Sequence, residues 1–138
     1  MDKTQLEALV RQILAEKLGS NPVKFFSPNV TISENDRLDT GNPADRVYTH
    51  DLFSLTDSPR LGAGVMVMEK STFPWKLSYD EIDYVLEGSL TVRTEQGEVS
   101  ARAGEGILIP RGSSIHFSAP EYAKFLYITY PADWQAQK

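Results

Sequence analysis

The chain has 138 residues, which suits one domain with a short appendage, and its hydrophobic share of 41% is that of an ordinary globular protein. A formal net charge of −5 argues against a nucleic-acid-binding protein, because such proteins usually carry a basic face. The absence of cysteine excludes disulfides and thiolate chemistry, and without a membrane-spanning apolar run or the apolar core of a secretory signal we expect a cytoplasmic protein.

Residues 1–19 are predicted to form an N-terminal segment with an amphipathic helix at residues 4–18. Apolar side chains recur there with the 3.6-residue helical period, at Leu6, Leu9, Val10, Ile13 and Leu14. Thr4 and Glu7 have the spacing of a capping box, and Gly19 marks the end of the helix. Two interpretations stay open: the stripe packs within this protein, or it docks on another one.

Residues 20–46 are predicted to be a linker and irregular loop, in which Val30 and Ile32 form at most one short strand. Residues 47–138 are predicted to be all-β. Short segments rich in β-branched and aromatic residues alternate there with turn residues, at 47–55, 61–70, 81–86, 89–94, 98–103, 106–109, 114–118 and 124–130. Seven or eight short strands at this spacing are typical of a sandwich or a barrel.

The stretch 73–88, FPWKLSYDEIDYVLEG, contains most of the residues suited to chemistry. Strand alternation places an apolar set and an acidic set on opposite faces, the first being Ile82, Tyr84 and Leu86 and the second Glu81, Asp83 and Glu87. Taken alone, this pattern favours acids that face water, because burying unpaired acids is costly.

Two short patterns modify that expectation. Glu81-x6-Gly88 and Gly104-x5-Pro110-x-Gly112 resemble the two signature motifs of the cupin superfamily, over roughly residues 47–134. The resemblance implies a double-stranded β-helix barrel in which the position of Glu81 points inward and Asp83 shares its face. Glu87 lies nearer the turn and is expected to be solvated.

Most cupins bind a transition metal through three histidines and one glutamate. Glu81 matches the glutamate, but positions 74–77 hold Pro-Trp-Lys-Leu where two histidines belong, and Ile115 takes the place of the third. His116 is one residue late, which turns its side chain to the opposite face of a strand. With two histidines in the chain, a three-histidine site cannot form in one subunit, and we expect no iron, manganese or nickel site.

The stretch FPWKLSYDEIDYVLEG, with IPRGSSIHF and FLYITYPADW downstream, resembles the EutQ family, the cupins of ethanolamine-utilization operons. The resemblance implies a homodimer in a bacterial microcompartment and an acetate kinase activity, which interconverts acetate and ATP with acetyl phosphate and ADP. It also implies that the helix at residues 4–18 can bind shell proteins, which its periodicity does not distinguish from ordinary packing.

Within this interpretation, Glu81, Asp83 and Tyr79 are the candidate catalytic residues. Two acids at i and i+2 lie about 6–7 Å apart along a strand. They are suited to hold Mg²⁺, which prefers oxygen ligands, or to crowd each other so that one becomes a general acid. The candidate substrate contacts, for ATP and acetate, are Lys76, Trp75 and Arg111.

No glycine-rich phosphate cradle accompanies these residues, so the kinase expectation rests on the resemblance alone. Two alternatives remain. One is a non-enzymatic module that docks to a microcompartment shell, and the other is an isomerase or lyase with an oxygen-ligated metal.

Overall fold

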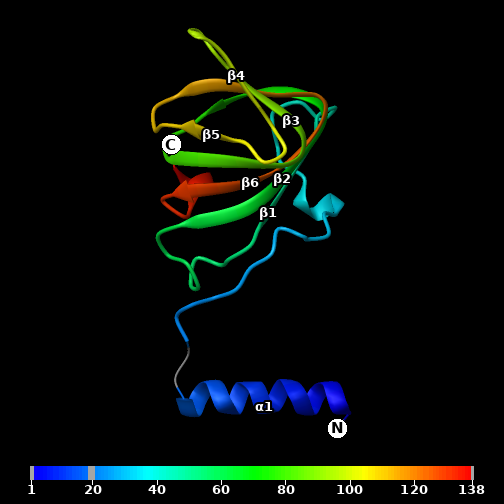
Figure 1. Cartoon of the computed structure of the whole chain (residues 1–138), viewed down its shortest axis with the longest axis vertical. Helices are drawn as coiled ribbons and strands as arrows, with labels where there is room; N and C mark the ends of the chain where they lie inside the picture. Colours follow the sequence, from blue (N-terminus) through cyan, green and yellow to red (C-terminus); the bar gives the residue numbers. More distant parts are fainter. Residues whose placement is uncertain (1, 19–20, 138) are drawn as a thin grey trace.

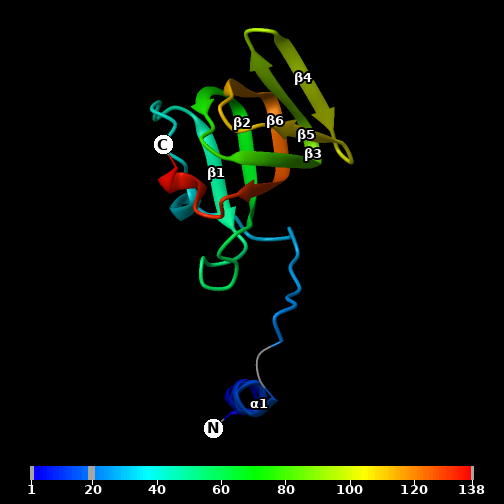
Figure 2. The same cartoon turned by 90° about the vertical axis from the view of Figure 1, so that its left-hand side faces the viewer.

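The computed structural model describes residues 2–18 and 21–137, without the side chains of residues 14–18. Figures 1 and 2 show a β-barrel, and a helix, α1 (Lys3–Leu18), that lies apart from it and is followed by an extended segment. None of the helices in these ranges is long and apolar enough to span a bilayer.

The beginning of α1 differs from the prediction. The backbone amide of Gln5 donates to Asp2 Oδ1 (2.7 Å), and the amide of Asp2 donates to Gln5 Oε1 (3.1 Å). This reciprocal capping box replaces the one predicted at Thr4 and Glu7, because aspartate caps a helix at least as well as threonine does. The predicted stop at Gly19 lies outside the described residues.

The apolar stripe of α1 remains open to solvent. Its four described members are between 39% and 52% exposed: Leu6, Leu9, Val10 and Ile13. The fifth, Leu14, has a side chain outside the description. The stripe is therefore not covered by the described part of the barrel.

Six antiparallel strands form the barrel: β1 (Arg46–Asp51), β2 (Gly62–Lys76), β3 (Asp80–Thr94), β4 (Gly97–Arg102), β5 (Gly106–Ile109) and β6 (Ser114–Tyr130). The order is β1-β2-β6-β3-β4, and β5 pairs with β3. Short 3₁₀ turns precede and follow the barrel at η1 (Glu34–Asp36) and η2 (Trp134–Ala136).

The strands are fewer and longer than predicted. The segments predicted at 81–86 and 89–94 are one bent strand, β3, and those at 114–118 and 124–130 are one strand, β6. Gly88 makes the bend possible, because its φ of 76° is costly for other residues and a Cβ there would lie 2.1 Å from the Tyr122 carbonyl oxygen. The glycine therefore turns the strand without ending it. The proposed strand at Val30 and Ile32 is absent from the described structure.

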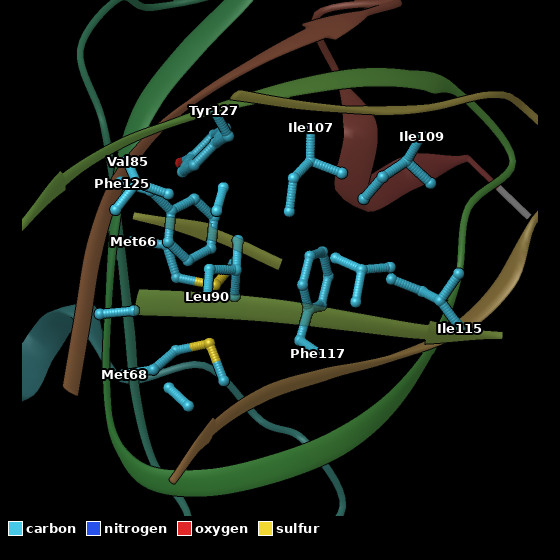
Figure 3. Packing of buried hydrophobic residues seen from close by; sticks show 14 of the residues in the cluster. Met66, Met68, Val85, Leu90, Ile107, Ile109, Ile115, Phe117, Phe125 and Tyr127 are labelled. Atoms are coloured by element: carbon cyan, nitrogen blue, oxygen red, sulfur yellow. The ribbon is translucent and has the colours of Figure 1, made fainter. Parts of the chain in front are cut away.

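Apolar side chains fill the barrel interior, as Figure 3 shows for Met66, Leu90, Ile107, Phe117 and Phe125, among others. Residues outside the strands complete this core, since Tyr79 and Trp134 belong to it and Leu38 packs against it. The buried side chains are not all apolar, because they include the two acids of β3, Glu81 and Asp83.

A second buried cluster lies outside the barrel, where Val30 and Ile32 pack on Tyr48, Val65 and Val67. Because directly paired residues share a face, the register Val65↔Leu126↔Tyr84 continues this apolar surface across β6 and β3. There it is uncovered. We call this uncovered part the outer sheet face, and its most exposed members, between 45% and 67%, are Ile82, Tyr84, Leu108 and Tyr130.

Candidate functional site

The acids of β3 point into the barrel. Glu81 is 4% exposed and Asp83 0%, whereas Ile82 between them is 49% exposed. The solvated acids favoured by alternation alone are therefore wrong for these two residues, and the inward orientation implied by the cupin motif is confirmed. Glu87 is exposed, as expected.

Neighbouring strands hold the acids on both sides. Glu81 pairs with Ile109 of β5 and Thr129 of β6, and Asp83 pairs with Ile107 and Tyr127 of the same strands. Three of these four partners have apolar or aromatic side chains. Consequently, the acids receive almost no polar compensation from the sheet that positions them.

Three carboxyl oxygens of the pair accept no hydrogen bond from the described residues: Glu81 Oε2 and both oxygens of Asp83. Burial raises the pKa of Glu81 to about 7. Burial, together with the charge of Glu81, raises the pKa of Asp83 well above its usual range. Because no hydrogen bond compensates these oxygens, burial favours the protonated, neutral form of both carboxyls.

An aromatic cluster closes the end of the barrel above the pair. The ring of Trp134 contacts those of Trp75, Tyr79 and Tyr127, at centroid distances of 6.1, 6.1 and 5.7 Å. The Trp75 Nε1 also donates to the Tyr79 hydroxyl (2.8 Å). β2 with its following turn thus meets β6 and η2, which lie far from it in the sequence.

Tyr79 and Tyr127 lie close enough to Glu81 for its charge to raise the pKa of their hydroxyls. Burial is the main cause that raises the pKa of Tyr79, and the charge of Glu81 is the second. Burial also raises the pKa of Tyr127, with further contributions from Asp51 and from Glu81. The Tyr127 hydroxyl donates a hydrogen bond to Asp51 Oδ1 (2.7 Å). The two hydroxyls are therefore neutral donors beside the acids at physiological pH.

A cavity of about 670 Å³ lies outside the aromatic cluster. Three predicted site residues line it, Trp75, Lys76 and Tyr79. Lys76 is exposed, so its ammonium group meets solvent at the mouth. The two acids do not line this cavity, whereas Tyr79 and Trp134 do.

Arg111 does not join this group. It is exposed, it does not line the cavity, and its backbone amide donates to Asp80 Oδ1 (2.8 Å) in a turn. Arg111 thus lies in a turn, apart from the residues that line the cavity. The substrate contact predicted for it gains no support from this position.

His116 faces away from the barrel interior, as its position one residue after Ile115 predicted. Ile115 is buried at 3%, while His116 beside it is exposed on the other face of β6. His50 is engaged elsewhere, with its Nδ1 2.9 Å from Asp36 Oδ1. Among the described residues, no group of three or more His, Cys, Asp or Glu side chains is placed to hold a metal ion.

Glu81 and Asp83 nevertheless suit one particular ion. Mg²⁺ is commonly held by one or two carboxylates and completes its coordination with water and substrate phosphates. The three oxygens without hydrogen-bond donors are the feature such an ion would satisfy. The donor set therefore fits Mg²⁺ and does not fit a histidine-bound transition metal.

Sequence reasoning missed Trp134 and Asp51. Trp134 follows the last strand in a short irregular segment, where no periodicity marks a residue as buried. Asp51 ends β1 and looks like an ordinary exposed acid, yet it holds the hydroxyl of Tyr127. The one signal was the segment FLYITYPADW, which belongs to the family resemblance and contains Trp134.

Comparison with known proteins settles the family. The profile described as "Ethanolamine utilisation protein EutQ" matches residues 1–136. The chain belongs to the EutQ family. It is 52% identical to a protein of Clostridioides difficile strain 630 named "Acetate kinase EutQ", over 99% of this chain and 96% of that protein.

Relatives of other lengths and solved structures agree with this assignment. A Salmonella typhimurium protein with the same name is 48% identical over 62% of this chain, but that match spans only 38% of the longer Salmonella protein. The solved structure of the Clostridium difficile EutQ protein has a TM-score of 0.78 and 59% identity, covering 80% of this chain and 81% of that one.

The cupin fold is confirmed as well. A cupin superfamily protein from Desulfitobacterium hafniense has a TM-score of 0.55 at 14% identity, covering 62% of this chain and 77% of that one. At so low an identity the likeness concerns the fold alone.

Proposed function

We propose that this member of the EutQ family is an acetate kinase that interconverts acetate and ATP with acetyl phosphate and ADP. The observation that carries the proposal is the buried pair Glu81 and Asp83, three of whose four carboxyl oxygens lack donors, together with a cavity lined by Lys76 and Tyr79. The name of the Clostridioides difficile relative, which matches along nearly all of both chains, supports the same reaction.

Phosphoryl transfer asks a protein mainly for positioning and for neutralisation of charge. Glu81 and Asp83 would hold Mg²⁺, which would supply positive charge to neutralise the phosphates. Lys76 adds a second cation at the mouth, where it can bind the polyphosphate as it enters. The neutral hydroxyl of Tyr79 can donate to a phosphate or carboxylate oxygen, and the rings of Trp75 and Trp134 beside it limit the access of water.

The test is the formation of acetyl phosphate by purified protein with acetate, ATP and Mg²⁺. We expect Glu81→Gln and Asp83→Asn each to abolish turnover. The matched control is Glu87→Gln, which removes an exposed acid of the same strand outside the barrel. Wild-type turnover no greater than that of a mock purification would refute the proposal, and so would full activity of Glu81→Gln.

A second candidate function, a docking module of the ethanolamine microcompartment, is favoured by the uncovered stripe of α1. Shell proteins would bind that stripe, and encapsulation would place the protein inside the compartment. The two functions are compatible, because α1 lies apart from the barrel (Figure 1).

The outer sheet face supports the proposed homodimer. Leu108, at 67% exposure, lies beside Ile82 on this face, and contiguous exposed apolar side chains of this kind are common at interfaces between subunits. Sedimentation equilibrium should show a dimer that Leu108→Lys converts to a monomer. A wild-type monomer at micromolar concentration would contradict this assignment.

A further inference from the structure

Trp134 packs on the aromatic side chains next to the acid pair, because it contacts Tyr127, which is paired directly with Asp83 across the sheet. Its side chain is 5% exposed and contacts Tyr79 and Tyr127, the two tyrosines that sense the charge of Glu81. The turn that carries it, red in Figures 1 and 2, follows the last strand of the barrel. A ligand that approaches Glu81 past these tyrosines must therefore pass the place that the indole ring occupies.

Space for a moved indole exists on both sides. The cavity of about 670 Å³ lies on the side of Trp75 and Tyr79, and a second cavity of about 360 Å³ lies against Leu52, Ser58 and Gly62. Trp134 and Gln135 line both cavities. Displacement of this one side chain joins the two spaces and opens them toward the acids.

The turn is weakly attached apart from the indole ring. The Trp134 Nε1 lies 3.4 Å from Asp51 Oδ1, a long hydrogen bond to an oxygen that already accepts from Tyr127 (2.7 Å). Within the turn, the backbone bonds Ala136 to Asp133 and Gln137 to Trp134 are both 3.3 Å long. The Gln137 Nε2 donates to the Asp133 carbonyl oxygen (3.0 Å) within the same turn, and Ala132 and Trp134 are its buried residues. A short segment held mainly by such local bonds opens at a lower free-energy cost than the sheet.

We propose that η2 is a gate over the acid pair, with Trp134 as the side chain that closes it and Asp51 as its latch. This inference deepens the proposed function and rests on its assignment of the pair as the site. Opening of the gate admits the Mg-nucleotide to Glu81 and Asp83, and closure excludes water from the same space.

Carboxyl footprinting tests the gate without an activity assay. Carbodiimide-promoted coupling of glycine ethyl ester labels accessible carboxyls, and peptide mass spectrometry locates the label. In wild type, Glu81 and Asp83 should be labelled far more slowly than the exposed Glu95. Trp134→Ala should accelerate labelling of the pair by about tenfold or more, because three ring contacts that each favour closure are lost.

Two further variants keep the result interpretable. Val67→Ala, in the cluster outside the barrel, loosens the protein without touching the gate and should leave the labelling ratio unchanged. Asp51→Ala should raise the labelling of Glu81 through loss of the latch, and it decides the matter if Trp134→Ala does not fold. Labelling of the pair that Trp134→Ala or, in its place, Asp51→Ala leaves at the wild-type rate would overturn the gate.

The gate and the kinase can fail separately. Accelerated labelling in Trp134→Ala, with no acetyl phosphate formed by wild type, removes the proposed reaction and retains the gate. Acetyl phosphate formation with unchanged labelling in both gate variants retains the reaction and removes the gate.

Discussion

Rising pH should destabilise this protein through its buried acids. The pKa of Glu81 is about 7 in the folded barrel, against an ordinary value of 4.5. Between these values the unfolded chain has lost the proton and the folded chain keeps it. The folded state then binds more protons, so the free energy of unfolding falls as pH rises. The contribution of Glu81 to the free energy of unfolding is complete below pH 4.5 and is lost as the pH rises through 7.

The size of the loss follows from the same two values. At 1.36 kcal/mol for each pKa unit, the rise of Glu81 from 4.5 to about 7 corresponds to a loss on the order of 3 kcal/mol. The pKa of Asp83 is raised as well, so its contribution has the same sign and adds to the loss. For a domain of ordinary stability this is a large fraction of the total.

Urea unfolding at pH 4.5, 6, 7 and 8, in EDTA so that no Mg²⁺ compensates the pair, measures this loss directly. The variant Glu81→Gln/Asp83→Asn should show a much flatter profile. Groups that do not contact the pair, such as Asp36 beside His50, are the same in both proteins and cancel in the comparison. Equal pH profiles for wild type and variant would refute the reasoning, because the acids would then be ionised at no cost to folding.

Three other outcomes are expected. Mg²⁺ should raise the urea midpoint more at pH 8 than at pH 5.5, since protons compete for the oxygens of Glu81 and Asp83; equal increments would argue against binding at the pair. Gly64→Ala should lower stability by about 1–3 kcal/mol in calorimetry, because its Cβ would lie 2.1 Å from the Tyr127 hydroxyl oxygen, whereas Gly97→Ala would meet no atom within 4 Å and is strained only through its φ of 135°. Deletion of residues 1–19 should leave barrel unfolding unchanged and release the protein from microcompartments; a destabilised barrel or retained encapsulation would contradict a docking helix.

Strand alternation and the cupin motif made opposite predictions about which face of β3 is buried. Alternation correctly paired Glu81 with Asp83 and Ile82 with Tyr84, because the period of a strand is a property of the backbone. It assigned the wrong set to solvent, since burial depends on what lies on either side of the sheet. That information is in the cupin motif, which fixes the position of Glu81 relative to the whole barrel.

Strand ends were harder to predict than strand positions for a related reason. The strands predicted at 81–86 and 89–94 lie on either side of Gly88, because a glycine usually marks a turn. In the barrel it lets β3 bend from one part of the wall to the next, where Tyr122 lies against its backbone. The number of strands therefore depended on tertiary contacts that no local window contains.

The replacement of histidines at positions 74–77 also explains why this site needs a cap. A histidine-bound metal would neutralise Glu81 permanently and would hold its own water. In this chain Trp75 packs instead against Trp134, and the acids lie beneath aromatic rings with no resident cation among the described groups. Such a pair is stable only while it retains protons or receives a cation from outside. The proposed Mg-nucleotide would meet this need during turnover, which is consistent with acids that are buried, uncompensated and covered by one movable side chain.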